Sequence, residues 1–232
     1  MTRSTNARLA GFTFLLYIAV GITQMVLSSG MAGAGGTAAR LALIVEHEPV
    51  VRINILLTLL TSVIALTLSV ALYGLTRDVD RDLAVLALVC RVGEGMLAAT
   101  APMASLGLLW LATGGTGPNA PDREAANALG SYLLKVGGWN TTTCATLFAF
   151  GSTLFSWLLL RGRLIPVALA WLGVFASVLL VVGLPLQLAG LAPGAVVQLL
   201  WLPMAAFEIP LGVWLLIKGV PLPVHGHLGE TT

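Results

Sequence analysis

The chain has 232 residues, of which 57% are hydrophobic and only 9% are charged. A soluble domain would carry about 25% charged residues, so this composition, with a mean hydropathy of +0.95, excludes an ordinary soluble protein. The formal net charge of +2 is too small to indicate nucleic-acid binding, and we expect no nucleic-acid partner.

Apolar segments long enough to cross a bilayer recur along the chain. A spanning helix needs about 20 largely apolar residues, and the segments that meet this requirement are 9–29, 51–75, 83–112, 129–160, 164–188 and 195–217. The sequence therefore predicts an all-α fold, a polytopic bundle of six transmembrane helices in which residues 1–232 form a single integral membrane domain. The two longest connections, residues 30–50 and 114–128, are rich in Gly, Pro and Asn and are predicted to be turns and irregular structure.

Basic residues indicate the orientation. Most of them would share one side of the membrane with the N-terminus: Arg3, Arg8, Arg77, Arg81, Arg161, Arg163 and Lys218. The opposite side would carry Arg40, Arg52 and Arg123. Because cytoplasmic loops carry an excess of Lys and Arg, both termini are predicted to be cytoplasmic. The bias toward Ala, Gly, Leu and Arg suggests a bacterial source, so we expect a multi-pass protein of the bacterial inner (cytoplasmic) membrane, with membrane lipids as partners.

Two carboxylates and one arginine lie at membrane depth. Glu94 belongs to the third predicted span and Glu208 to the sixth, and Arg91 precedes Glu94 by about one helical turn on the same face. Helix rise places Glu94 roughly 16 Å and Glu208 roughly 14 Å from the cytoplasmic end. An ionisable side chain at such depth costs about 2.5–3.5 kcal/mol on insertion scales and usually faces the bundle interior. If the third and sixth helices touch, the three side chains can form one cluster.

This cluster has two interpretations. It can be a charge-compensated polar lock that fixes which helices meet and binds nothing. Alternatively, at least one of the two glutamates reaches a pocket near the midplane of the membrane. Because two carboxylates share one intramembrane arginine, one of them lacks a full partner, and an unpaired carboxyl in an apolar site favours the protonated form. That is the form a proton donor or a proton carrier needs.

Other side chains extend the predicted site. Trp171 and Trp201 lie deeper than the interfacial tryptophans and are candidates for a pocket wall. Gln24 and Asn140 lie closer to the outer face and are candidate ligand-binding residues along an entrance. The same outer half holds further polar residues, Thr141, Thr142, Thr143 and Gln198. The alternative for the polar group is ordinary hydrogen bonding between helices.

Prolines and histidines give two further expectations. Pro203 and Pro210 bracket Glu208, and each removes a backbone hydrogen bond and is expected to bend the last helix, either as an ordinary kink or as an opening beside a cavity. The histidines, His47, His225 and His227, fall in a loop and in the tail. We therefore expect no metal site and no cofactor at membrane depth.

Several segments together resemble a known family. They are 7–11 (ARLAG), 53–55 (INI), 72–75 (LYGL), 91–94 (RVGE), 161–166 (RGRLIP) and 207–220 (FEIPLGVWLLIKGV). The pattern is similar to that of the bacterial membrane proteins grouped as domain of unknown function 4386, over nearly the whole chain. The resemblance implies a single six-helix domain with an Arg and a Glu in the third span and a Glu in the last, matched here by Arg91, Glu94 and Glu208. It implies no established activity, and the region 30–40 departs from the pattern.

Three classes of function fit these observations. The first is an enzyme doing acid-initiated, terpene-cyclase-like chemistry on a lipophilic small molecule, with Glu94 or Glu208 as the acid, Arg91 fixing the ionisation of the other, and a tryptophan shielding the cation. The second is a proton-coupled small-molecule transporter that uses the carboxylates as a relay. The third is a non-catalytic membrane sensor or lipid-binding component. The sequence identifies neither the ligand nor the oligomeric state.

Overall fold

The computed structural model describes residues 2–30, 35–114 and 120–220. Within these ranges the chain is helical and forms no strand. The helices in chain order are α1 (Arg3–Ser29), α2 (Thr37–Glu46), α3 (Glu48–Thr76), α4 (Arg81–Ala98), α5 (Ala101–Ala112), α6 (Arg123–Arg161), α7 (Val167–Leu188), α8 (Gly194–Leu199) and α9 (Trp201–Ile217).

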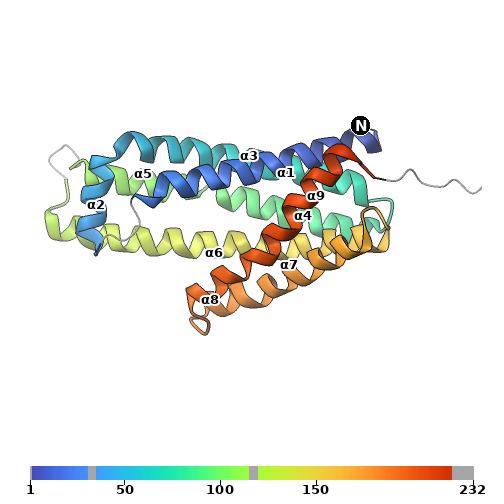
Figure 1. The fold of residues 1–232 in the computed structure, drawn as a ribbon. Coiled ribbons are helices and arrows are strands. Elements are labelled where there is room, and N and C mark those ends of the chain that lie inside the picture. Colours follow the sequence, from blue (N-terminus) through green and yellow to red (C-terminus); the bar gives the residue numbers. More distant parts are fainter. Residues whose placement is uncertain (1, 31–34, 115–119, 221–232) are drawn as a thin grey trace, which may run out of the picture.

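Six helical units are long and apolar enough to cross a membrane. They are α1, α3, α4 continued by α5, α6, α7, and α8 continued by α9. The prediction of an all-α bundle with six spans is therefore confirmed. The start of α1 and the end of α9 lie at the same end of the bundle (Figure 1), which an even number of spans requires. The side of the membrane on which this end lies stays a prediction.

Helix α2 corrects the expectation for the first long connection. Irregular structure is the wrong prediction for Thr37–Glu46, which forms a helix across the end of the bundle opposite the termini (Figure 1), here called the α2 end. Its Leu41 and Ile44 lie three residues apart on one face and are buried in a small core with Val51 and three leucines of α5. The second connection is also shorter than predicted, because α6 already begins at Arg123.

Two spans are interrupted at prolines. In the third span α4 ends at Ala98 and α5 begins at Ala101, and Pro102 cannot donate a backbone hydrogen bond there. At this break the carbonyl of Leu97 accepts from Thr100 N at 3.0 Å, from Thr100 Oγ1 at 2.7 Å and from Asn140 Nδ2 at 3.2 Å. In the last span the break falls between α8 and α9, and Pro203 lies in the first turn of α9. Pro210 lies inside α9.

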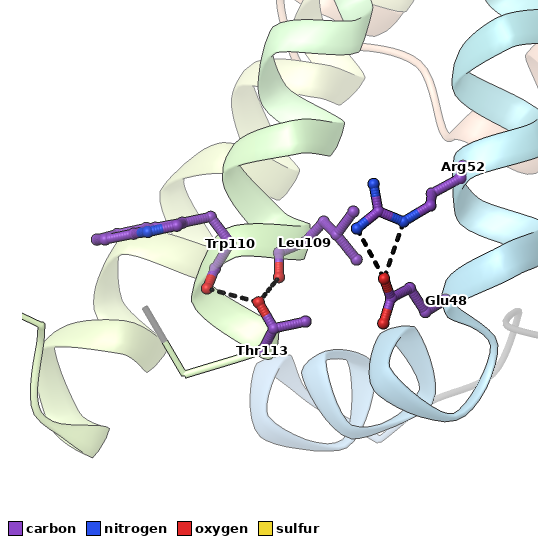
Figure 2. Close-up of polar contacts among 5 residues, drawn as sticks. All are labelled: Glu48, Arg52, Leu109, Trp110 and Thr113. Atoms are coloured by element: carbon purple, nitrogen blue, oxygen red, sulfur yellow. Dashed lines mark hydrogen bonds and ion pairs between the residues drawn. The ribbon is translucent and has the colours of Figure 1, made fainter. Parts of the chain in front are cut away.

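Side-chain hydrogen bonds lie at the start of α3 and at the end of α5, both at the α2 end of the bundle (Figure 2). In the first turns of α3, Arg52 Nε donates to Glu48 Oε1 at 2.8 Å. At the end of α5, Thr113 Oγ1 donates to the carbonyls of Leu109 and Trp110, at 3.0 and 3.3 Å. The second contact adds a side-chain donor at carbonyls of the last turn, where that of Leu109 also accepts from Thr113 N at 3.0 Å.

The main core lies between α1, α3, α4, α6, α7 and α9. Helices α1 and α9 cross at glycines: a Cβ atom added at Gly11 would lie 2.7 Å from the carbonyl oxygen of Gly212. Such close backbone approach at small residues is typical of helix packing in membranes. Many large apolar side chains point outward, among them Met103 and Leu191, as expected for a surface in contact with lipid. The crossing brings the middle of α9 beside the middle of α1, where the charged residues lie.

Candidate functional site

Arg91 and Glu94 form a buried ion pair on α4. Arg91 Nη1 lies 2.7 Å from Glu94 Oε2, across one helical turn. The two residues are only 1% and 4% exposed. Isolated charges at this depth would be strongly unfavourable, so the pairing is what allows the two side chains to be buried together. The spacing in the sequence predicts this contact.

Helix α6 shapes the space around Arg91. The guanidinium carbon of Arg91 lies 4.6 Å from the centre of the Phe148 ring, a cation–π contact. Three residues further along α6, a Cβ atom at Gly151 would lie 2.6 Å from Arg91 Cγ. The missing side chain of Gly151 therefore provides the room in which the arginine stem passes between α4 and α6.

Tyr17 brings α1 into the cluster. Its hydroxyl donates a hydrogen bond to Glu94 Oε1 at 3.2 Å. Glu94 thus faces a partner with each of its oxygens, Arg91 with one and Tyr17 with the other. The sequence analysis missed Tyr17, although one signal was present: a phenolic hydroxyl in the middle of a spanning helix needs a hydrogen-bond partner when it is buried.

A small cavity of about 10 Å³ lies on another side of Arg91. Ser152 and Ser156 of α6 and Phe207 of α9 are among its lining residues. Arg91 Nε makes no hydrogen bond to any described residue. The volume is close to what a single water molecule needs, and the two hydroxyls could serve as its further partners.

Glu208 lies on α9 in different surroundings. It is 8% exposed, and within the described part of the chain no hydrogen bond or ion pair involves it. Its neighbour Phe207 lines the same small cavity as Arg91, so this part of α9 lies near the ion pair of α4. Helices α4 and α9 are nevertheless not among the closely packed pairs, whereas α1 packs on α9 and α6 packs on α4. Side chains of α1 and α6 therefore connect the two spans.

Glu208 lines a groove of about 330 Å³ between α1 and α9, here called the α1/α9 groove. The other residues along it are Ile18, Gly21, Ile22, Met25, Trp201, Ala205 and Ile209. Ile22 and Met25 belong to the apolar outer surface of the bundle. The groove is therefore an apolar recess on the lipid-facing side, and Glu208 is its one carboxyl group.

Trp201 links this groove to the ion pair. Its ring centre lies 5.6 Å from that of Phe148, with 30° between the ring planes. Phe148 in turn lies under the guanidinium of Arg91. Trp171, the other tryptophan proposed for a pocket wall, is 54% exposed on α7 and lines neither the groove nor the small cavity.

The proposed polar entrance does not come together as one path. Gln24 lines a separate cavity at the α2 end, and Asn140 is bound to the Leu97 carbonyl at the break between α4 and α5. Thr141, Thr142 and Thr143 donate to carbonyls of their own helix. Gln198 is exposed on α8. For most of these residues the interhelical or local hydrogen bond is the better explanation of their presence.

Metal-binding side chains do not gather within the described ranges, where no group of three or more His, Cys, Asp or Glu lies together. His47 caps the turn between α2 and α3, where its Nδ1 lies 3.1 Å from the Leu43 carbonyl. His225 and His227 fall outside the described residues. The chemistry available at the cluster is thus that of two carboxyls, one guanidinium, one phenol and an indole.

Comparison with protein families places the whole bundle in one group. The family model described as "Domain of unknown function (DUF4386)" matches residues 9–219. The chain belongs to this family. The DUF4386 match runs from α1 to the end of α9 and so includes Arg91, Glu94 and Glu208. Neither a curated protein nor a solved structure matches the chain. Membership of DUF4386 confirms the resemblance and assigns no activity.

Proposed function

We propose that this membrane protein binds a lipophilic small molecule, which enters the α1/α9 groove sideways from the bilayer and meets Glu208 at its inner wall. The observation that carries the proposal is the position of Glu208. A carboxyl that has no hydrogen-bond partner among the described residues lines an otherwise apolar recess. Binding sites for small molecules commonly combine such an apolar wall with a few polar groups that orient the ligand.

The surroundings of Glu94 differ from those of Glu208, and this difference supports the assignment of Glu208 to ligand binding. Glu94 has both a cation and a hydroxyl as partners, which suits a structural role in joining α4 to α1. Glu208 shares the field of Arg91 but does not touch it. A carboxyl in that position, in its neutral form, can donate a hydrogen bond to a ketone, ether or hydroxyl of the ligand.

Acid-initiated catalysis is a second candidate, and the position of Trp201 favours it. In this reaction neutral Glu208 would transfer its proton to one carbon of an alkene, or to an epoxide oxygen. The carboxylate and a carbocation would form together, and loss of a proton from the product cation back to the carboxylate would complete the cycle. The face of Trp201, on the same groove, could stabilise the cation. Arg91 could then stabilise the negative charge that forms on Glu208.

A proton-coupled carrier has less support. Such a protein needs a path for its cargo from one face of the membrane to the other. The cavity that contains Gln24 and the α1/α9 groove that contains Glu208 share no lining residue. These two cavities are therefore separate recesses at two levels of the bundle.

Native mass spectrometry with lipid analysis tests the proposal. Ala205 and Ala206 are adjacent exposed residues of α9, and of the two only Ala205 lines the groove. We expect a co-purifying lipophile in the wild type and in Ala206→Trp, and its loss in Ala205→Trp and in Glu208→Gln. Its chemical class would then nominate substrates for an acid-catalysis assay. The same bound species in all four proteins, or none in any, would contradict binding at the groove.

A further inference from the structure

A second cavity, of about 250 Å³, lies at the α2 end of the bundle. It lies between α1, α2, α3, α5 and α6, and we call it the α2 cavity. Its polar lining residues are Gln24, Ser28, Arg40, Asn54, Thr58 and Ser105, and the rest of the wall is aliphatic. It shares no residue with the α1/α9 groove, so it is a separate site that the proposed function does not use.

Hydrogen bonds between α1 and α3 hold its wall in place. Gln24 Nε2 donates to Thr58 Oγ1 at 2.9 Å, and Thr61 Oγ1 donates to Gln24 Oε1 at 3.3 Å. Asn54 Nδ2 donates to Ser28 Oγ at 3.0 Å. These contacts fix the direction of the polar groups before any ligand arrives, which reduces the ordering cost of binding.

One polar group of this wall has no partner among the described residues. Asn54 Oδ1 is buried and accepts no hydrogen bond. Exchanging the amide nitrogen and oxygen would not remove the mismatch, because Ser28 would then pair with the oxygen and leave the amide nitrogen unpaired. Buried polar atoms in proteins nearly always have a partner. The cavity therefore offers an unmet hydrogen-bonding group to a bound molecule.

The charge of the cavity wall is positive. Arg40 is its one ionisable side chain, and no acidic residue lines it. A guanidinium pairs with phosphate through two parallel hydrogen bonds, and a hydroxyl such as that of Ser105 can donate to a remaining oxygen. The amphipathic helix α2 carries Arg40 at the end of the spans, the level at which phospholipid headgroups lie.

We propose that the α2 cavity binds a phosphate-bearing molecule, with the phosphate against Arg40 and a hydroxyl or amine of the ligand donating to Asn54. A phospholipid headgroup and a water-soluble phosphate ester both carry this chemistry. The small volume suits a headgroup or a compact ester, because drug-sized ligands occupy about 300–1,000 Å³. The site is independent of the groove, so either proposal can fail without the other.

Calorimetric titration of the purified full chain in detergent tests this site with three probes: inorganic phosphate, glycerol 3-phosphate and dihexanoylphosphatidylglycerol. We expect saturable binding of at least one ester, tighter than that of inorganic phosphate. Tighter binding of glycerol 3-phosphate would identify a soluble ligand, and tighter binding of the short-chain lipid would identify a headgroup site. Ala205→Trp, which blocks only the groove, should leave this binding unchanged.

Arg52 provides the matched control for Arg40. It is also an arginine at the α2 end, where it pairs with Glu48 (Figure 2), and it does not line the cavity. Arg40→Gln should weaken binding about tenfold or more through loss of a charged hydrogen bond, whereas Arg52→Gln should change it less than about twofold. Ser105→Leu, which fills the cavity from α5 and leaves Arg40 intact, should also abolish binding. The proposal is overturned if no probe binds saturably, if both arginine variants lose binding equally, or if Ser105→Leu binds like the wild type.

Discussion

Tyr17 and Glu94 are 77 positions apart in the sequence and are joined by a hydrogen bond of 3.2 Å in the middle of the bundle. This contact fixes α1 to the carboxylate that also pairs with Arg91. The two buried glutamates of the cluster therefore differ. Glu94 is engaged by two neighbouring side chains, whereas Glu208 faces a groove on the lipid side.

Tyr17→Phe removes one hydroxyl and keeps the ring. Because a buried oxygen of Glu94 then loses its partner, the free energy of unfolding should fall by about 1–3 kcal/mol. Tyr132→Phe is the control, because Tyr132 is 61% exposed on α6 and makes no side-chain hydrogen bond within the described residues. Thermal unfolding in detergent measures both. Equal melting temperatures for the two variants would show that the Tyr17–Glu94 contact contributes no stability.

Removing one partner of the Arg91–Glu94 pair should be worse than removing both. Arg91→Met leaves an unpaired buried carboxylate and should cost about 3–5 kcal/mol, whereas the double variant Arg91→Met/Glu94→Gln should recover part of this loss. Equilibrium unfolding of the wild type, the two single variants and the double variant gives the coupling energy between the two side chains. The exposed Arg161–Asp80 pair, at 2.9 Å, is the reference cycle and should show a coupling below about 1 kcal/mol. Additive losses at Arg91 and Glu94 would contradict a direct ion pair.

Two glycines of α6 should respond to alanine with opposite signs. Gly151→Ala places a methyl group against the stem of Arg91 and should destabilise the protein by about 1–3 kcal/mol. Nothing lies within 4 Å of a Cβ atom at Gly137, so Gly137→Ala should stabilise α6 by about 0.5–1 kcal/mol through higher helix propensity. The free energies of unfolding of the two variants and of the wild type test this prediction. Stabilisation by both substitutions would show that Arg91 does not pass beside Gly151.

The two glutamates should differ in their contribution to stability. Glu94→Gln removes the counter-charge of a buried arginine and should lower the free energy of unfolding by about 3–5 kcal/mol. Glu208→Gln removes a carboxyl that has no hydrogen-bond partner, and stability should stay the same or rise. Equal destabilisation by the two substitutions would instead support the interpretation of all three residues as a structural lock.

Much of this architecture could be predicted from the sequence because membrane burial leaves a strong apolar signal. The six spans are confirmed, and the spacing of Arg91 and Glu94 correctly indicated a contact along one helix. Helix rise also predicted Glu94 and Glu208 at one level, and Phe207, next to Glu208 on α9, lines the same small cavity as Arg91. These are features that periodicity and length determine locally.

Features that depend on which helix faces meet were not predicted. Tyr17 reaches Glu94 of α4 from α1, although α1 packs closely on α3 and α9 and not on α4, and no local pattern reports such a contact. Trp171 and Trp201 look alike in sequence, yet one lies on the outer surface and the other on the groove. Helix α2 was missed because the glycines before it outweighed the short apolar repeat of Leu41 and Ile44.

Labelling with dicyclohexylcarbodiimide, a membrane-soluble reagent that modifies protonated carboxyls, tests the central claim most directly. Protein in lipid vesicles would be treated and its peptides analysed by mass spectrometry. The account predicts modification of Glu208 and protection of Glu94, with labelling of Glu208 reduced in Ala205→Trp and retained in Ala206→Trp. Labelling of Glu94 in preference to Glu208, or of Glu208 equally in both tryptophan variants, would contradict a lipid-accessible carboxyl in the α1/α9 groove.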